Sequence, residues 1–380
     1  MARDTDFDAR MMRRCLDLGA RAGGRTSPNP MVGAVVVRGR RVISMAWHRR
    51  AGAPHAEAAA LKRAGRRASG STLYVNLEPC CHYGRTPPCV DAIIAAGVRR
   101  VVAAHRDPFP LVDGRGFAAL RRAGVEVRMG PLKHEAARLN ERYLTRVTQR
   151  RPFVLVKAAM TLDGRIGTAA GESKWISSAR SRAEAHRMRA GHDAVMVGVN
   201  TALADDPRLT ARGPGSRSAI GAGPIRVVVD SHLRLGPKAR IFRGTGGRKP
   251  GAAAIVYTGP RASGSRLAAL ERVGARVVRV NTDATGRVDL REALRDLARR
   301  GVTNLMIEGG GELIASAFEA GLVDRVALFI APLILGGRDA VPVVGGRGIS
   351  ALRKAIVLRE VTVQPLGPDL LVRARVARRR

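Results

Sequence analysis

The sequence predicts an α/β protein built from two domains. Strand-like apolar runs alternate with helix-like stretches along most of the chain, and its 380 residues exceed what one ordinary domain needs. A third observation places the boundary at Arg150-Arg151-Pro152, because proline cannot continue a helix and disfavours helical backbone in the residue before it. We therefore expect domains at residues 1–150 and 151–380.

In the first domain the alternation is typical of an α/β fold with a mostly parallel sheet. We expect helices at residues 8–22, from about 56, and at 89–96, 117–123 and 133–147. We expect strands at residues 31–37, 41–46, 72–76, 100–104 and 125–128.

The second domain repeats this alternation. Its expected strands are residues 153–159, 194–198, 225–230, 253–258, 275–280, 304–307 and 326–330. Its expected helices are residues 178–190 and 290–299, with another after Gly311. Two polar, glycine-rich segments, 213–223 and 244–251, are interpreted as surface loops.

The composition is that of a globular protein, with 45% hydrophobic and 26% charged residues. The formal net charge is +36, from 67 Lys and Arg against 31 Asp and Glu, and the basic residues are mostly arginines spread over both halves. Aromatic residues are only 3%, which leaves little material for stacking single-stranded bases. We therefore expect a solvated basic surface and no nucleic-acid partner, although arginine suits an anionic small molecule.

The chain has no secretory signal pattern near its start and no apolar run of membrane-spanning length. Its cysteines, Cys15, Cys80, Cys81 and Cys89, are too few and too clustered to form a disulfide framework. We expect a cytoplasmic protein without a membrane partner. In that reducing compartment a cysteine cluster indicates metal binding or catalysis.

Two segments, His55-Ala56-Glu57 and Pro79-Cys80 with Cys89, follow strands and begin helix patterns, as in zinc deaminases. A neutral imidazole and two thiolates bind zinc tetrahedrally and leave a fourth position for water. His55, Cys80 and Cys89 are the predicted ligands. Glu57 is placed to carry a proton from that water to the departing ammonia without binding the metal.

The spacing of the cysteines leaves an alternative open. Eight residues separate Cys80 from Cys89, where two are commoner, so Cys81 and His82 compete as ligands. A closed set of Cys80, Cys81, Cys89 and His82 would be purely structural. The separate His55-Ala56-Glu57 element favours the hydrolytic site.

Three segments of the first domain, Ser27–Gly33, Pro54–Glu57 and Glu78–Cys89, resemble the deaminase domain of the bifunctional riboflavin-biosynthesis deaminase-reductase family. The resemblance implies a cytidine-deaminase-like fold, with zinc bound by His55, Cys80 and Cys89 and protons carried by Glu57. It also implies that Asn29, His48 and Arg85 lie beside the pyrimidine. One departure is visible, because Cys81 stands where the family usually has serine.

A second motif lies at Ile307–Ser316, where an apolar strand leads through Gly309, Gly310 and Gly311 into a helix. Glycines let the backbone approach a phosphate, and the helix N-terminus offers free N–H groups. This pattern differs from the dinucleotide fingerprint G-x-G-x-x-G, and any strand-to-helix turn can use glycine. By itself it does not establish a nucleotide site.

The second half resembles the reductase domain of the same family, whose fold is similar to dihydrofolate reductase. The matching segments are Arg151–Gly164, Gly171–Ile176, Arg189–Ala194, Gly198–Arg212 and Glu308–Gly310. The resemblance implies that NADPH is bound by Ala159, Trp175, Thr201, Asp205, Gly310, Gly311, Glu312, Leu313, Ile314, Ala315 and Ser316. It implies that the substrate ribotide is bound by Ser173, Arg189, Leu209, Arg212 and Glu308.

The resemblance covers residues 6–337 and implies two consecutive activities of riboflavin biosynthesis. The first is zinc-dependent hydrolytic deamination of 2,5-diamino-6-(5-phosphoribosylamino)pyrimidin-4-one, and the second is NADPH-dependent reduction of its ribosyl group to ribityl. It also implies a homo-oligomer. Two alternatives remain open: a deaminase acting on nucleic acid, and a zinc-stabilised protein that senses NADPH without oxidising it.

Overall fold

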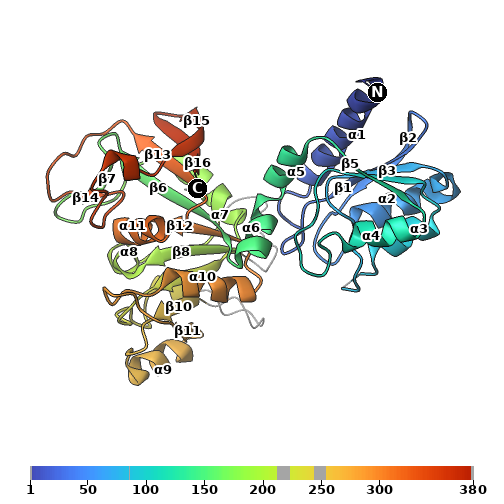
Figure 1. The fold of residues 1–380 in the computed structure, drawn as a ribbon. Coiled ribbons are helices and arrows are strands. Elements are labelled where there is room, and N and C mark those ends of the chain that lie inside the picture. Colours follow the sequence, from blue (N-terminus) through green and yellow to red (C-terminus); the bar gives the residue numbers. More distant parts are fainter. Residues whose placement is uncertain (1, 85, 212–222, 244–253, 378–380) are drawn as a thin grey trace. The chain divides into compact units, whose positions relative to one another are not determined.

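The computed structural model describes residues 2–84, 86–211, 223–243 and 254–377, with side chains from residue 6 onward. The chain divides into two compact units, Met1–Arg150 and Arg151–Arg380 (Figure 1). Of the two predicted glycine-rich loops, only Gly223 lies within the described residues. Among the helices of the described chain, none is long and apolar enough to cross a membrane.

The first unit contains a sheet in the order β2-β1-β3-β4-β5. Its strands are β1 (Gly33–Arg38), β2 (Arg41–Trp47), β3 (Thr72–Val75), β4 (Arg100–Ala103) and β5 (Glu126–Met129). Its helices are α1 (Ala2–Ala20), α2 (Ala56–Ala64), α3 (Cys89–Ala95), α4 (Arg115–Arg122), α5 (Lys133–Leu139) and α6 (Glu141–Gln149).

The prediction of a mostly parallel sheet is wrong for this unit. β3, β4 and β5 pair in parallel, but β1 pairs antiparallel with both β2 and β3. The short turn between Arg38 and Arg41 accounts for the pairing of β1 with β2, since a connection of two residues joins only antiparallel strands.

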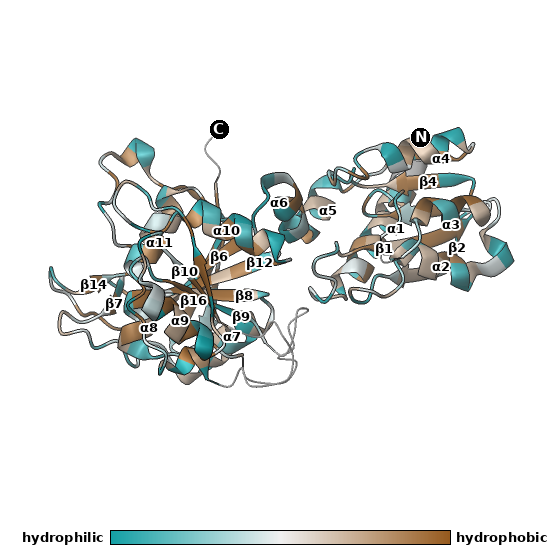
Figure 2. Cartoon of the chain, turned by 90° about the horizontal axis from the view of Figure 1, so that it is seen from below, coloured by the Kyte–Doolittle hydropathy of each residue, from teal (hydrophilic) through white to brown (hydrophobic). Residues whose placement is uncertain are grey.

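Helices cover both faces of this sheet. Apolar side chains of α2, α3 and α4 pack on one face, and those of α1 and α5 pack on the other. Colouring by hydropathy shows the strands as the apolar interior of the unit (Figure 2). The alternation of faces along β1 is visible in the two clusters, because Ala34 and Val36 belong to one and Val35 and Val37 to the other.

The single helix predicted at residues 133–147 is interrupted at Asn140, which separates α5 from α6. The Asn140 side chain is buried and holds the backbone of Met31, accepting from its N–H at 2.7 Å and donating to its carbonyl at 3.1 Å. The periodicity of apolar residues along a helix does not reveal that one side chain binds the backbone of a distant segment.

The second unit contains a larger sheet in the order β11-β10-β9-β8-β12-β6-β13-β16-β15. Its strands are β6 (Phe153–Thr161), β8 (Ala194–Gly198), β9 (Ile225–Val229), β10 (Ala254–Thr258), β11 (Arg276–Arg279), β12 (Asn304–Glu308), β13 (Arg325–Ala331), β15 (Leu358–Leu366) and β16 (Asp369–Val376). β7 (Arg165–Gly167) and β14 (Val341–Pro342) form a separate pair. The helices are α7 (Ala179–Ala190), α8 (Val199–Asp205), α9 (Gly264–Arg272), α10 (Leu290–Arg299) and α11 (Gly311–Glu319).

The sheet is parallel from β11 to β13 and becomes antiparallel at β16 and β15. α10 and α11 pack on one face, whereas α8 and α9 pack on the other. The sequence prediction did not include α8, α9 or the four strands β7, β14, β15 and β16. β15 is exposed on both faces, so burial gives it no simple alternation to detect.

Gly33 lies at a close approach of β1 to α1. A Cβ at this position would lie 2.1 Å from the carbonyl oxygen of Cys15 and 2.9 Å from the backbone nitrogen of Gly19. Contacts this short are repulsive, so the packing of helix on strand requires glycine here.

We expect Gly33→Ala to lower the free energy of unfolding by about 1–3 kcal/mol, because the added methyl group must displace the backbone of α1. The urea midpoint measures this effect. Gly236→Ala is the control, since no atom lies within 4 Å of an added Cβ there. Equal midpoints for the two variants would contradict the packing argument.

Candidate active sites

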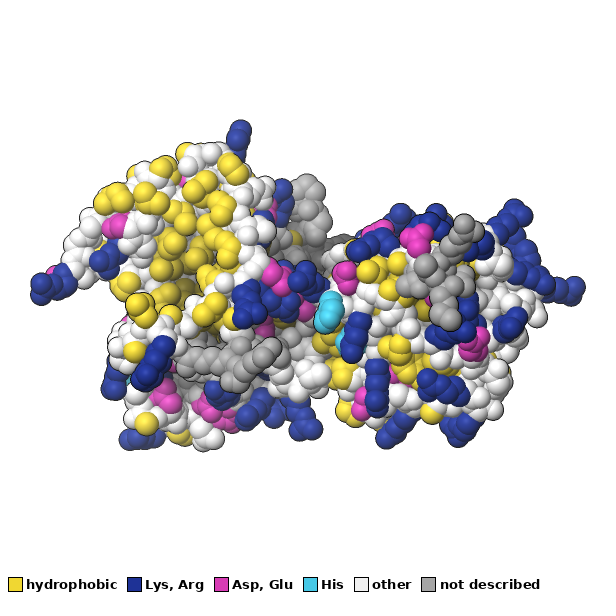
Figure 3. Space-filling model, turned by 45° about the horizontal axis from the view of Figure 1, so that its top comes forward, with side chains coloured by type: hydrophobic (Ala, Val, Ile, Leu, Met, Phe, Trp, Pro, Cys, Tyr) yellow, Lys and Arg dark blue, Asp and Glu magenta, His cyan; other side chains and the backbone are white. Residues whose placement is uncertain are grey.

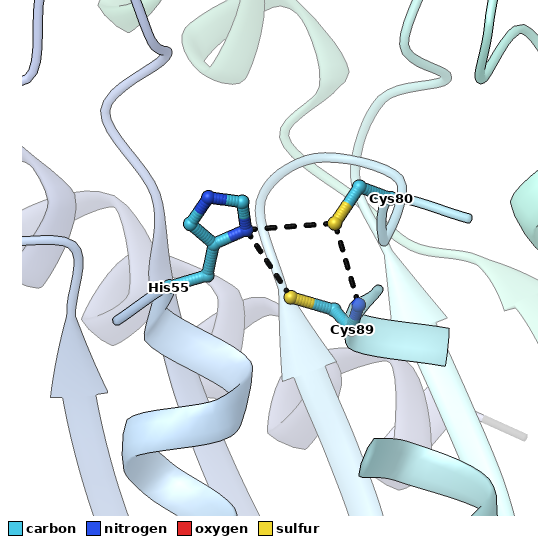
Figure 4. A group of neighbouring side chains, drawn as sticks. All are labelled: His55, Cys80 and Cys89. Atoms are coloured by element: carbon cyan, nitrogen blue, oxygen red, sulfur yellow. Dashed lines mark hydrogen bonds between the residues drawn. The ribbon is translucent and has the colours of Figure 1, made fainter. Parts of the chain in front are cut away.

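The three predicted metal ligands come together in the first unit. His55 immediately precedes α2, Cys89 begins α3, and Cys80 lies in the loop that follows β3. Their side chains point toward one another (Figure 4), with His55 Nδ1 3.5 Å from Cys80 Sγ and 3.3 Å from Cys89 Sγ. All three ligand atoms lie within 4.8 Å of one another, and one nitrogen with two sulfurs suits tetrahedral zinc.

Neighbouring groups orient these ligands. Thr86 Oγ1 lies 3.3 Å from His55 Nε2, so it can fix the ring with Nδ1 toward the sulfurs. The backbone N–H of Cys89 donates to Cys80 Sγ at 3.3 Å. Hydrogen bonding from Cys89, reinforced by His55, lowers the pKa of the Cys80 thiol to about 4, which favours the thiolate that a metal needs.

Cys81 and His82 do not join this group. The Cys81 thiol donates to the carbonyl oxygen of Leu111 at 3.4 Å, and the His82 ring lies against Phe109 with centroids 5.5 Å apart. The metal-ligating cluster found in the described chain consists of His55, Cys80 and Cys89. The alternative of a closed structural knot is therefore not the arrangement that forms.

Glu57 lies in the first turn of α2 and is only 4% exposed. Its Oε2 atom has no hydrogen-bond partner in the described part of the chain. Burial raises the pKa of Glu57 to about 7, although the neighbouring His55 opposes the shift. The carboxyl group is thus beside the ligands without belonging to them, and it can hold or release a proton near neutral pH.

Two of the three predicted pyrimidine-binding residues lie at the same site. The His48 ring packs edge-on against the His55 ring with centroids 5.1 Å apart, and Asn29 Nδ2 lies 3.4 Å from His48 Nε2. Burial lowers the pKa of His48, which favours the neutral form of its ring. The third residue, Arg85, lies outside the described residues.

The loop that carries Asn29 is held by residues that the sequence analysis missed. Besides Asn140, the fully buried Asn76 holds Met31 and Gly33, donating to the Met31 carbonyl at 3.0 Å and accepting from the Gly33 N–H at 2.8 Å. Asn76 follows β3 directly, and a buried amide after a strand is the one signal that could have indicated this role.

Glu78 is a second residue whose role the sequence did not reveal. Its buried carboxylate accepts from the backbone N–H groups of Asp107, Gly114 and Phe117 at 3.0–3.2 Å. These bonds fasten the segment before Cys80 to the loop and helix that follow β4. Glu78 therefore positions a metal ligand and does not itself face the site.

In the second unit a cleft of about 1090 Å³ lies at the carboxyl ends of the parallel strands. It brings together most of the residues predicted to bind the dinucleotide and the ribotide. Those that line it are Ala159, Ser173, Trp175, Arg189, Thr201, Asp205, Leu209, Glu308, Gly310, Gly311, Glu312, Leu313, Ile314 and Ser316. Ala315 is buried and does not line the cleft. Arg212 lies outside the described residues.

A buried ion pair forms one wall of the cleft. Arg189 binds Glu308 through two contacts, Nε to Oε1 at 2.8 Å and Nη2 to Oε2 at 2.5 Å. The guanidinium keeps the pKa of Glu308 below its ordinary value despite burial. Arg189 also donates to the carbonyl of Thr210 at 3.4 Å, so it ties α7 to both β12 and the segment that carries Leu209.

Lys157 is a residue of this wall to which the sequence analysis gave no role. Parallel pairing of β6 and β12 sets Lys157 beside Glu308, and Lys157 lines the cleft. Its Nζ lies 5.3 Å from the centre of the Phe329 ring. Burial lowers the pKa of Lys157, while Glu308 favours its charged form.

Polar contacts also hold together a second part of the cleft lining, formed by Ser173, Lys174 and Asp205. Ser173 Oγ donates to Asp205 Oδ1 at 3.0 Å, and Lys174 Nζ lies 3.7 Å from the same oxygen. Trp175 is 71% exposed, and the Arg182 guanidinium lies 4.5 Å above its ring. An exposed aromatic surface on a cleft wall is available to pack against a planar ligand.

These folds and sites define a two-part enzyme: a zinc-dependent hydrolytic deaminase joined to a nucleotide-dependent reductase. The family model for the cytidine and deoxycytidylate deaminase zinc-binding region matches residues 5–105, and that for the RibD C-terminal domain matches residues 152–372. The chain belongs to the RibD family, the bifunctional deaminase-reductases of riboflavin biosynthesis.

Known members of this family align over nearly the whole chain. Riboflavin biosynthesis protein RibD of Aquifex aeolicus is 40% identical over 97% of this chain and 98% of its own, and that of Escherichia coli is 37% identical over 96% and 98%. The structure of Acinetobacter baumannii RibD is 33% identical, with a TM-score of 0.85 over 98% of this chain and 100% of that one. A Thermotoga maritima diaminohydroxyphosphoribosylaminopyrimidine deaminase/5-amino-6-(5-phosphoribosylamino)uracil reductase is 34% identical, with a TM-score of 0.80 over 98% and 100%.

The family expected from the motifs is therefore confirmed, as are the two α/β folds, the zinc-binding deaminase domain and a reductase domain of the NADPH-dependent type. The chain is therefore a bifunctional enzyme of riboflavin biosynthesis, and the two alternative hypotheses, a nucleic-acid deaminase and a nucleotide sensor, are set aside.

We expect Cys80→Ser and Cys89→Ser each to lower bound zinc by at least about tenfold, because each replaces a metal-binding thiolate with a weak ligand. Zinc per chain, measured by atomic absorption after gel filtration, tests this. Cys81→Ser is the matched control and should retain the wild-type zinc content. Zinc loss in Cys81→Ser equal to that in Cys80→Ser would contradict the ligand set.

Proposed function

We propose that residues 1–150 carry out the deamination and residues 151–380 the reduction. We further propose that their substrates are the two pyrimidine ribotides that name the Thermotoga relative, taken in that order. The observation that carries the proposal is the group of His55, Cys80 and Cys89 with the buried carboxyl of Glu57 beside it. The chemistry of each step follows from the residues around the two sites.

In the deaminase the chain's own residues supply the ligands, the proton carrier and the substrate contacts. His55, Cys80 and Cys89 would hold a zinc ion, which would lower the pKa of water enough to provide a nucleophile near neutral pH. Glu57 accepts the proton released as this nucleophile attacks the amino-bearing carbon and delivers it to the leaving ammonia. Asn29 and the neutral ring of His48 orient the pyrimidine by hydrogen bonding.

We expect Glu57→Ala to reduce ammonia release from the diaminopyrimidine ribotide by at least about 10²-fold, because general acid–base catalysis contributes about that much or more. Zinc content and NADPH oxidation with substrate that has already been deaminated should stay at the wild-type level. Loss of bound zinc in this variant would instead make Glu57 a ligand and end the proton-carrier role.

In the reductase the cleft binds the dinucleotide and the ribotide side by side. NADPH bound there would supply a hydride for C1′ of the ribosyl group. As the bond from C1′ to the ring oxygen opens, its electron pair goes to that oxygen, which must gain a proton. Lys157 is the group placed to donate this proton, because it lines the cleft and burial lowers its pKa. Arg189 and Glu308 hold each other in a fixed orientation against the ribotide.

We expect Lys157→Met to reduce NADPH oxidation by at least about 10²-fold while ammonia release is unchanged, because only the reductase loses its acid. The wild-type reductase rate should fall with rising pH, since the acid must be protonated, and the midpoint should lie below the ordinary lysine value of 10.5. Stopped-flow absorbance at 340 nm measures both. A normal rate in Lys157→Met would exclude this residue as the acid.

We also propose a cytoplasmic homo-oligomer. Free thiols at all four cysteines fit a reducing compartment. In the second unit, apolar side chains gather over the region of β14 to β16 (Figure 3). Ile334, Leu352, Val357, Val361 and Val363 are each more than half exposed, and β15 is the edge strand of the sheet. A patch of this kind marks an interface, and a second copy of the chain is the partner that the family implies.

We expect sedimentation velocity to give a dimer or a larger assembly, and Val363→Lys to shift it toward monomer by placing charge in the interface. Met129→Lys is the control, because Met129 is about as exposed but lies in the first unit. A monomeric wild-type protein at micromolar concentration would contradict the proposal.

A further inference from the structure

The reductase cleft extends well beyond the wall formed by Lys157 and Glu308. In the sheet, β8 lies between β12 and β9, so the end of β9 is two strand spacings, about 10 Å, from the end of β12. Ser231, His232 and Arg234 follow β9 and line this part of the cleft, together with Arg287 from the loop between β11 and α10. The hydride and proton transfers proposed for the reductase do not involve this basic end of the cleft.

Each of the two arginines contacts a residue near the glycine turn that begins α11. Arg234 Nη2 donates to Asn200 Oδ1 at 2.5 Å. The next residue, Thr201, has its hydroxyl 3.0 Å from the position of a Cβ on Gly310. Arg287 Nη2 lies 2.7 Å from Glu312 Oε2 in the first turn of α11. Both guanidinium groups therefore lie in loops anchored beside the turn where the dinucleotide's pyrophosphate is expected.

The loop of Arg287 is also tied to the end of β9. The N–H of Val288 donates to Ser231 Oγ at 3.0 Å. The Asp283 carboxylate accepts from the N–H groups of Thr285 and Arg287, which closes this loop into a tight turn. Arg287 and the residues after β9 are thus parts of one connected surface.

Charge distinguishes this end of the cleft from the other. Lys174 and Arg182, the cations near Trp175, are engaged by Asp205 and by the indole ring. At the β9 end, Asp230 is fully buried, accepts from the N–H of Leu235 and does not line the cleft. Two described carboxylates of the lining contact this surface: Glu312 is paired with Arg287, and Asp206 accepts from the backbone N–H of Arg240 at 2.7 Å.

The position of the adenosine half follows from these constraints. The nicotinamide must reach the wall of Lys157 and Glu308, and the pyrophosphate lies at the glycine turn after β12. The remaining half of the dinucleotide then extends toward β9. A site that selects NAD places a carboxylate against the ribose hydroxyls, whereas a site that selects NADP places arginine there for the 2′-phosphate.

We propose that Arg234 and Arg287 bind the 2′-phosphate of the adenosine ribose and thereby select NADPH over NADH. This assignment rests on the proposed reductase function and adds its cofactor-specificity residues. Guanidinium groups form charge-assisted hydrogen bonds to phosphate oxygens, and neither group is needed to bind a ribose that carries only hydroxyls.

Titration calorimetry of the full-length, zinc-loaded protein with NADP⁺ and NAD⁺ tests the assignment, since the oxidised forms bind without turnover. We expect Arg234→Gln and Arg287→Gln each to weaken NADP⁺ binding by about 10-fold or more, with NAD⁺ binding changed by less than about twofold. In turnover the KM for NADPH should rise while kcat is unchanged. Arg291→Gln, an exposed residue of α10 that does not line the cleft, is the matched control and should preserve the wild-type preference.

The outcomes separate this assignment from the reductase function itself. A wild-type preference for NADP⁺ that both variants retain overturns the role of the two arginines and leaves the reductase intact. Equal weakening of NADP⁺ and NAD⁺ also overturns it, because the arginines would then support binding in general. Binding of neither dinucleotide to the wild-type protein overturns the proposed reductase together with this assignment.

Discussion

The parallel pairing of β6, β8 and β12 is the constraint on which the reductase site depends. It sets Lys157 directly beside Glu308 and brings the ends of β8 and β12 to one edge of the sheet, where Thr201 meets the glycine turn. Burying an unpaired charge here would destabilise the fold. The two contacts between Arg189 and Glu308 offset this desolvation penalty. Two cations against one carboxylate leave the wall positive, which suits an anionic ribotide.

The deaminase site depends in the same way on strand ends that lead into helices, but its rigidity comes from the backbone. Glu78 fastens the segment before Cys80 through three N–H groups, and a Cβ on Gly116 would lie 2.2 Å from the carbonyl oxygen of Pro79. The loop that holds Cys80 is therefore packed closely against α4. The fold itself therefore holds the three candidate ligands together and keeps the Glu57 carboxyl desolvated beside them.

A net charge of +36 does not by itself identify a partner, because most arginines are solvated. Three arginines that line the cleft are instead each held by a particular polar group. Arg189 is held by Glu308, Arg234 by Asn200 and Arg287 by Glu312. All three arginines line the cleft, so one residue type is placed to serve both roles proposed for them, substrate positioning at one end and cofactor recognition at the other.

The sequence by itself determined the family, through motifs that resemble it, and the bounds of α10, and it predicted the group of His55, Cys80 and Cys89 that the structure brings together. Capping, periodicity and motif spacing are properties of short segments, which is why these features could be predicted. Only the tertiary structure decided the antiparallel pairing of β1 with β3, the break at Asn140, the exclusion of Cys81 from the metal cluster and the place of Lys157 beside Glu308. Each of these depends on which distant segment packs against a residue. Burial and pairing between segments far apart in the chain leave no periodic signal in either segment alone.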